Sequence, residues 1–96
     1  MTVGMIGLGV MGSAMAMHLA NAGLLSAVWN RTQARGQKIA ADLNVDHTDD
    51  LAGLADCSDV LITCVSADAD LQAVIAELTP SLRAGQIVVD TSTVGV

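Results

Sequence analysis

Short apolar runs alternate with longer, partly polar segments along the whole chain. Runs of this length, bounded by glycine or polar residues, are typical of strands that are buried on both faces of a parallel sheet. We therefore predict strands at Thr2–Ile6, at Ser26–Trp29, around Val45, at Val60–Val65 and at Ile87–Val89.

The segments between these runs carry apolar residues at helical spacing, which predicts four helices. Gly23 is placed to end the first helix in a left-handed conformation. Thr32 is expected to cap the second helix and Thr48 or Asp49 the third, while acids at the start of the fourth suit its positive end. The residues expected to face inward are Met11, Ala14, Met15, His18, Leu19 and Ala22, then Gly36, Ile39, Ala40 and Leu43, then Leu51, Leu54 and Ala55, then Leu71, Val74, Ile75 and Leu78.

Strands and helices in regular alternation predict an α/β fold, a Rossmann-like doubly wound parallel sheet with helices on both faces. The 96 residues suffice for one such domain, residues 1–96. Its core must be built from small aliphatic side chains, because Trp29 is the single aromatic residue.

The net charge of −6 argues against nucleic acid or an anionic membrane as a partner. Three of the four basic residues, Arg31, Arg35 and Lys38, nevertheless lie close together and are expected to form a local positive field. The two cysteines resemble neither a disulfide framework nor a zinc site, and no apolar run approaches the roughly 18 residues of a membrane span. The start of the chain lacks the features of a secretion signal, so a soluble, cytoplasmic protein is expected.

A glycine-rich motif of the form GxGxxG lies between the first predicted strand and the first predicted helix, the context in which it indicates dinucleotide binding. Its residues are Gly7, Leu8, Gly9, Val10, Met11 and Gly12. The first glycine permits a tight turn, the second lets main-chain amides approach a pyrophosphate, and the third lets the helix lie close to the sheet. Amides and the dipole at the helix start then hold the phosphate charge. Glycines in such a turn can also be purely structural, and the motif alone does not distinguish NAD, NADP and FAD.

The end of the second predicted strand follows the glycines by about 20 residues, where an acid would bind the ribose 2′-hydroxyl of NAD. The sequence Trp29-Asn30-Arg31-Thr32 contains no acid there. Arg31 instead offers a rigid fork of charged donors suited to a 2′-phosphate, and Asn30 and Thr32 add neutral hydrogen bonds. This pattern favours NADP over NAD, and the alternative is that Arg31 is a solvated surface residue.

These stretches, together with Asp90-Thr91-Ser92-Thr93, resemble the β-hydroxyacid dehydrogenase family, which includes 3-hydroxyisobutyrate dehydrogenase and, more distantly, 6-phosphogluconate dehydrogenase. The resemblance spans essentially the whole chain. It implies an N-terminal NADP-binding Rossmann domain in which the loop after the fourth strand, from Cys64 through Val65 and Ser66 to Asp70, lies along the cofactor.

The same resemblance implies that Ser92 orients the substrate carboxylate and that Thr93 contacts the cofactor. Hydroxyls directly after a buried strand lie at the carboxyl edge of the sheet, where ligands bind, although helix capping is the alternative role. The chain departs from the family at His18, Ser66 and Val96, where the family usually has asparagine, proline and proline. These differences are compatible with the β-hydroxyacid dehydrogenase family, but they do not indicate which member of the family the chain resembles most.

The family's proton-exchanging lysine belongs to a second, all-helical domain that this chain lacks, so we expect no catalytic residue here. Lys38, the only lysine, is predicted to lie on a helix near the 2′-phosphate and out of reach of a substrate. His47 lies among acids without a ligand spacing, so we expect a solvated loop and no metal site. His18, on an apolar helical stripe, is expected to be packed or half-buried.

The leading interpretation is the NADP-binding domain of an oxidoreductase that transfers hydride between a nicotinamide cofactor and a small β-hydroxyacid or semialdehyde. The isolated chain is expected to bind the dinucleotide without turnover, because a small carboxylate substrate requires the second domain. Two alternatives stay open, a non-catalytic NADPH-binding regulatory module and the N-terminal domain of an imine reductase. A sheet that lacks its second domain would also favour self-association into a homo-oligomer.

Overall fold

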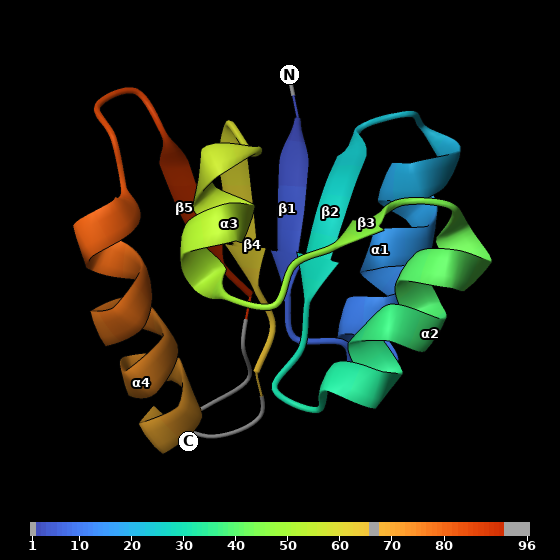
Figure 1. The fold of residues 1–96 in the computed structure, drawn as a ribbon, viewed down its shortest axis with the longest axis horizontal. Helices are drawn as coiled ribbons and strands as arrows, with labels where there is room; N and C mark the ends of the chain where they lie inside the picture. The colour runs from blue at the N-terminus through green and yellow to red at the C-terminus, as the bar shows by residue number, and fades with distance from the viewer. Residues whose placement is uncertain (1, 66–67, 92–96) are drawn as a thin grey trace.

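The computed structural model describes residues 2–65 and 68–91, without the side chains of residues 68–70. Its strands form one parallel sheet in the order β3-β2-β1-β4-β5 (Figure 1). The strands are β1 (Val3–Ile6), β2 (Leu25–Trp29), β3 (Asp46–His47), β4 (Val60–Thr63) and β5 (Ile87–Asp90). The helices are α1 (Val10–Asn21), α2 (Gln33–Leu43), α3 (Leu51–Asp56), α4 (Asp68–Leu78) and the 3₁₀ turn η1 (Thr79–Ser81).

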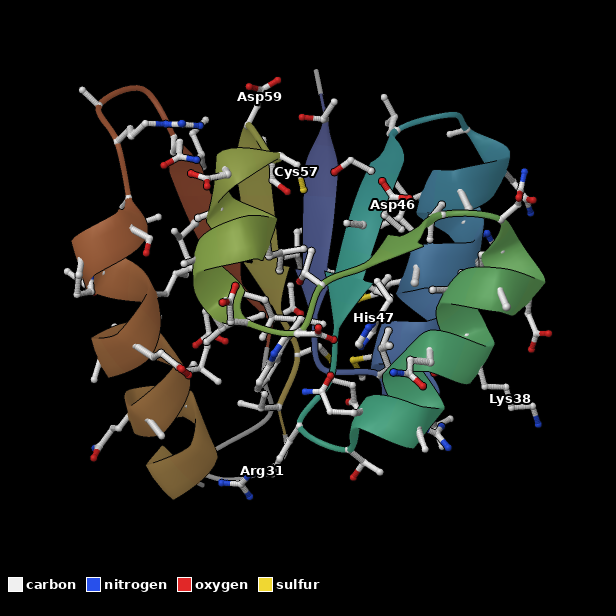
Figure 2. The ribbon with its side chains drawn as sticks, in the orientation of Figure 1. Arg31, Lys38, Asp46, His47, Cys57 and Asp59 are labelled. Atoms are coloured by element: carbon white, nitrogen blue, oxygen red, sulfur yellow. The ribbon has the colours of Figure 1, made fainter. Side chains whose placement is uncertain are left out.

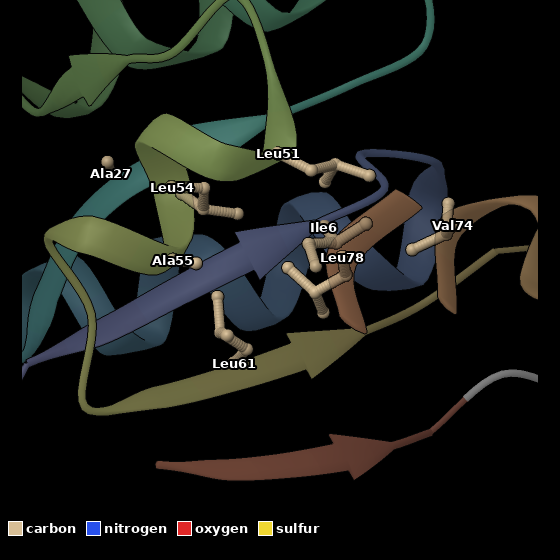
Figure 3. Packing of buried hydrophobic residues seen from close by; sticks show 8 residues of the cluster. All are labelled: Ile6, Ala27, Leu51, Leu54, Ala55, Leu61, Val74 and Leu78. Carbon is tan, nitrogen blue, oxygen red and sulfur yellow. The ribbon is translucent and has the colours of Figure 1, made fainter. Parts of the chain in front are cut away.

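Helices cover both faces of the sheet, and each face has its own apolar cluster. Ala16 of α1 and Ala40 of α2 pack with Met5 on one face. Side chains of α3 and α4 pack with Ile6 and Leu61 on the other face, as Figure 3 shows. Because consecutive strand residues such as Met5 and Ile6 point to opposite faces, a strand covered on both sides must be apolar at every position. The predicted doubly wound α/β sheet is confirmed.

Helix α1 is rotated differently from the prediction. Gly12 and Ala16 are its buried residues, with Met15 and Leu19 packed beside them. The residues wrongly expected inside are exposed, namely Met11, Ala14, His18 and Ala22. Since α1 is apolar nearly all round, its pattern does not define an inner face, and the close approach of Gly12 to the Gly7 carbonyl sets the rotation. Neither α1 nor any other helix within the described ranges is long and apolar enough to cross a membrane.

Strand β5 and helix α4 are more exposed than predicted. Ile87 is 57% and Val89 40% exposed, because β5 is an edge strand and only the face that bears Val88 meets the cluster under α3 and α4. Ile75 of α4 is 38% exposed, whereas Val74 and Leu78 are buried as predicted. The edge position of β5 depends on the strand order, which the local pattern of apolar residues does not specify.

His47 does not lie in a solvated loop, so that expectation is wrong. It belongs to β3, where it pairs with Val28 of β2, and its side chain is only 10% exposed. A Cβ atom at Gly36 would lie 2.8 Å from the His47 ring, so the imidazole packs directly against α2. The glycine at position 36 is what lets the second helix approach the edge of the sheet.

The helix ends agree only partly with the predicted capping residues. Gly23 has the expected left-handed conformation after α1, with φ of 75°. Thr32 occupies the N-cap position of α2, but its hydroxyl makes no capping hydrogen bond. The cap of α3 is neither Thr48 nor Asp49, because the Asp50 carboxylate accepts a hydrogen bond from the Gly53 amide at 2.8 Å.

Replacing Asp50 with alanine is expected to lower the free energy of unfolding by about 1 kcal/mol, since the Gly53 amide loses its partner. Asp49→Ala is the matched control, because the Asp49 side chain is 92% exposed and its effect should stay within about 0.5 kcal/mol. Urea titration followed by the fluorescence of Trp29 measures both. Equal losses in the two variants would show that α3 does not depend on this cap.

Candidate functional site

A cavity of about 530 Å³ opens where β1, β2 and β4 end. The chain passes outward from β1 through β2 to β3 and then returns to place β4 on the other side of β1. This reversal of strand order is the place where open parallel α/β sheets bind ligands. The cavity is lined by Gly7, Leu8, Gly9, Val10, Met11, Gly12, Trp29, Asn30, Arg31, Thr32, Arg35, Cys64, Val65, Ala73, Val74 and Glu77.

The structure brings most of the predicted site residues together at this cavity. They are the whole glycine-rich turn with Asn30, Arg31, Thr32 and Val65. Asp70 lies in the first turn of α4, and its side chain is outside the description. The remaining predicted residues, Ser66, Ser92 and Thr93, lie outside the described residues.

Two glycines of the turn are required by close backbone approaches. Gly7 has a φ of 93°, and a Cβ atom there would overlap the Cys64 carbonyl oxygen. A Cβ atom at Gly12 would overlap the Gly7 carbonyl oxygen. These geometries fit the expected turn at the first glycine and the close helix packing at the third.

Gly9 differs from the other two glycines, because a Cβ atom there would meet no atom within 4 Å. Gly9 is also the N-cap of α1, which has neither an acid in its first turn nor a side chain capping its amides. The first amides of a helix have no intrahelical partners and carry the positive end of its dipole. An open, positively polarised stretch of main chain therefore faces the cavity, which suits an anionic group such as a diphosphate.

The peptide groups on either side of Leu8 are held by side chains from α1, from α2 and from the loop between β2 and α2. The Leu8 amide donates to Oδ1 of Asn30 at 2.9 Å. The Leu8 carbonyl accepts from the Ser13 hydroxyl at 2.9 Å and from Nε of Arg35 at 2.6 Å. Asn30 also donates through Nδ2 to the Thr32 carbonyl at 3.1 Å, so its side chain joins the turn to the end of β2. The sequence did not reveal the bonds from Asn30 and Arg35 to the Leu8 peptide groups, because they join residues 22 or more positions apart.

The basic residues of the predicted positive field separate in space. Arg31 and Arg35 line the cavity, and Lys38 does not. In Figure 2, Arg31 lies at the lower end of the sheet, between α2 and α4, whereas Lys38 points outward from α2. Lys38 lies about one helical turn beyond Arg35 along α2 and is off the cavity wall, so its contribution to the positive field stays a prediction.

One wall of the cavity was not predicted. This wall is formed by Ala73, Val74 and Glu77 of helix α4. Trp29 and Cys64, beside the predicted site residues Asn30 and Val65, also line the cavity. Cys64 also packs against the cluster under α1 and α2, as expected for a small apolar residue. No sequence signal distinguishes the α4 residues from ordinary packing.

Two hydroxyls tie the end of β5 to the end of β4. The buried Thr63 hydroxyl donates to the Asp90 carboxylate at 3.0 Å. The Thr91 hydroxyl and amide both donate to the Thr63 carbonyl at 2.9 Å. The chain therefore leaves β5 at the same edge of the sheet as the glycine-rich turn.

Metal-binding residues do not gather in residues 2–65 and 68–91, where no group of three or more His, Cys, Asp or Glu side chains is suitably placed for an ion. Cys57 and Cys64 are both free thiols. His47 Nδ1 lies 3.8 Å from the Asp49 carboxylate, which makes a pair and not a group of three.

A parallel sheet with this strand order and a glycine-rich turn at its point of reversal defines a nucleotide-binding domain of the Rossmann type. Residues 2–96 match the family described as the NAD binding domain of 6-phosphogluconate dehydrogenase, and the chain belongs to that family. It is thus a nicotinamide-dinucleotide-binding domain of the oxidoreductases, and the recognised resemblance is confirmed.

Two curated relatives illustrate the family. The chain is 35% identical over 95 residues to a probable 3-hydroxyisobutyrate dehydrogenase-like protein, mitochondrial, of Arabidopsis thaliana, an alignment that covers 95% of this chain and 28% of that protein. It is 31% identical over 96 residues to a decarboxylating 6-phosphogluconate dehydrogenase of Synechocystis, covering 93% of this chain and 20% of the relative. The chain thus spans less than a third of the length of either relative.

Solved structures of related oxidoreductases have the same fold as this chain. The fold superposes on 3-hydroxyisobutyrate dehydrogenase of Mycobacterium tuberculosis with a TM-score of 0.89 at 22% identity, covering 98% of this chain and 32% of that one. An imine reductase of Myxococcus stipitatus in complex with NADP⁺ gives a TM-score of 0.86 at 28% identity, covering 97% and 32%. The first likeness is one of fold alone, and the second extends to the sequence.

Proposed function

We propose that this chain is the NADP-preferring cofactor domain of an oxidoreductase that acts on a small β-hydroxyacid or semialdehyde. The observation that supports the NADP preference is the position of Arg31 on the cavity wall directly after β2, where NAD-specific domains carry an acid. A guanidinium binds a phosphate through paired, charge-assisted hydrogen bonds, whereas the ribose 2′-hydroxyl of NAD gives it no anionic partner.

The roles of the residues follow from their places around the cavity. The turn from Gly7 to Gly12 binds the diphosphate through main-chain amides, and the open space at Gly9 gives that group room. Arg31 and Thr32 hold the 2′-phosphate, while Asn30 both fixes the turn and borders this end of the cavity. When bound, the cofactor supplies the hydride-transferring nicotinamide, and the protein supplies orientation and electrostatics.

Further proposed contacts rest on the family resemblance. We assign Val65, Ser66 and Asp70 to the side of the cavity along the cofactor, Thr93 to the cofactor and Ser92 to the substrate carboxylate. Lys38 points outward from α2 in Figure 2 and does not line the cavity. The family resemblance assigns the proton-exchanging lysine to a separate helical domain. The purified 96-residue chain should therefore bind dinucleotide and catalyse no turnover.

An imine reductase is the second candidate function. It is favoured by the 28% identity and TM-score of 0.86 to the Myxococcus stipitatus enzyme. The two candidates share the cofactor domain and differ in the substrate, so a full-length protein assayed with β-hydroxyacids and with cyclic imines would separate them.

Titration of the chain with NADPH and with NADH tests the proposed cofactor preference. Trp29 lines the cavity and is the only tryptophan, so its fluorescence reports occupancy directly. At low salt, NADPH should bind about tenfold or more tightly than NADH, the size expected for a charge-assisted hydrogen bond. Equal affinities would refute the NADP preference, and binding of neither nucleotide would refute the proposed function.

A further inference from the structure

A guanidinium reaches the middle of the glycine-rich turn from a distant helix. Nε of Arg35, in the first turn of α2, donates to the Leu8 carbonyl at 2.6 Å across 27 residues of sequence. Leu8 itself is fully buried. The hydrogen bond is thus long-range in sequence, short in space and partly shielded from water, conditions under which a charged donor contributes most.

The peptide that Arg35 holds joins Leu8 to Gly9. A trans peptide is planar, so its carbonyl and its amide hydrogen point in opposite directions. The described part of the chain contains no cis peptide bond. A Leu8 carbonyl fixed toward Arg35 therefore fixes the Gly9 amide on the opposite side of the same peptide plane.

Arg35 is the only charged one of the three side chains that hold the peptide groups around Leu8. Of the two residues that this peptide joins, Leu8 is fully buried and Gly9 has no side chain that packs against a neighbour, so on the Gly9 side the orientation of the peptide depends on the hydrogen bonds to the Leu8 carbonyl. The Leu8 carbonyl has one other side-chain donor, the neutral Ser13 hydroxyl at 2.9 Å. The charged donor from α2 is the stronger of the two.

We propose that Arg35 is a positioning residue for the diphosphate subsite, because its guanidinium holds the Leu8 carbonyl and thereby orients the Gly9 amide. This assignment rests on the proposed function and separates the two arginines that line the cavity. Arg31 serves the 2′-phosphate directly, whereas Arg35 acts on the diphosphate through the main chain.

Two cofactor fragments distinguish these roles. ADP-ribose contains the diphosphate without a 2′-phosphate, and adenosine 2′-monophosphate contains a 2′-phosphate without the diphosphate. Arg35→Ala should weaken ADP-ribose binding about tenfold and change adenosine 2′-monophosphate binding less than about twofold, as expected when one charge-assisted hydrogen bond is lost at a single subsite. Arg31→Ala is the matched control with the same change of charge. It should weaken adenosine 2′-monophosphate binding about tenfold and change ADP-ribose binding less than about twofold. Calorimetry of the 96-residue chain measures all four effects.

The competing outcomes are distinct. Loss of adenosine 2′-monophosphate affinity in Arg35→Ala with ADP-ribose retained would make Arg35 a phosphate ligand and overturn the proposal. If Arg35→Ala loses affinity for both fragments, the role of Arg35 is merely structural and the proposal is overturned. If it loses affinity for neither fragment, the proposal is overturned as well. A wild-type chain that binds neither fragment would instead refute the proposed function.

A conservative variant and a spectroscopic signal complete the test. Arg35→Lys retains a charged donor, so it should recover ADP-ribose affinity to within about threefold of the wild type if a cation on the Leu8 carbonyl is what matters. In nuclear magnetic resonance spectra of the ligand-free chain, Arg35→Ala should shift the Gly9 amide resonance, and Arg31→Ala should leave it in place. An unshifted Gly9 resonance in Arg35→Ala would contradict the proposed orientation.

Discussion

Replacing Gly7 with alanine is expected to lower the free energy of unfolding by about 3 kcal/mol or more, because two penalties act in the same direction. The φ of 93° lies in the region that residues with a Cβ rarely adopt. The added methyl group would also overlap the Cys64 carbonyl oxygen, a backbone atom at the end of β4 that cannot turn aside as a side chain does. Since small domains have total stabilities of about 5–15 kcal/mol, a large part of the stability is lost. Urea or thermal unfolding measures the change.

Gly9→Ala is the matched control for this prediction, with the same chemical change two residues along the same turn. Gly9 has an ordinary φ of −69°, and its Cβ atom would meet nothing, so the variant should lose no more than about 1 kcal/mol, as expected for alanine at an N-cap. Its NADPH affinity should nevertheless fall sharply, because the methyl group occupies space proposed for the diphosphate. Equal destabilisation by both substitutions would contradict the geometry, and unchanged NADPH binding in Gly9→Ala would contradict the binding role.

The elements that were predictable from the sequence are those specified by local pattern. Consecutive apolar residues in β1 and β4 follow from burial on two faces, and Gly36 and Ala40 of α2 are buried as predicted. The predicted strand Val60–Val65 was too long, because β4 ends at Thr63 and the next residues, Cys64 and Val65, line the cavity. The apolar run therefore predicted the position of the strand but not the residue at which its pairing with the neighbouring strands ends.

The details that escaped prediction depend on tertiary contacts. The inner face of α1 is set by Gly12 meeting Gly7, and an almost wholly apolar helix gives no independent signal of that rotation. Arg35 and Asn30 were identified as polar residues near a phosphate, and only the fold shows that both hold the Leu8 peptide groups. Charge and hydrogen-bonding capacity can be inferred from residue type, but the partner of each group depends on which strand ends and helix starts come together.

Replacing Arg31 with alanine is expected to weaken NADPH binding by about 10- to 100-fold at low salt and to leave NADH binding within about twofold of the wild type. The reason is that the guanidinium loses charge-assisted hydrogen bonds to a phosphate that NADH does not carry. Arg31 is exposed, so solvent and ions screen the interaction, and the difference should shrink as salt rises from 0.01 M toward 1 M and the screening length falls from about 30 to about 3 Å. Trp29 fluorescence titrations at several salt concentrations measure it.

Lys38→Ala removes the same charge from a residue that lies outside the cavity wall. It therefore distinguishes direct contact between Arg31 and the 2′-phosphate from a general effect of positive charge in this segment. Its NADPH affinity should stay within about twofold of the wild type once salt exceeds about 0.1 M, where charges farther apart than about 10 Å are largely screened. If Lys38→Ala weakens NADPH as much as Arg31→Ala does, the phosphate is held by the summed positive field of the segment and not by a local guanidinium. If NADH loses as much affinity as NADPH in Arg31→Ala, the residue contributes to binding without selecting the phosphorylated nucleotide.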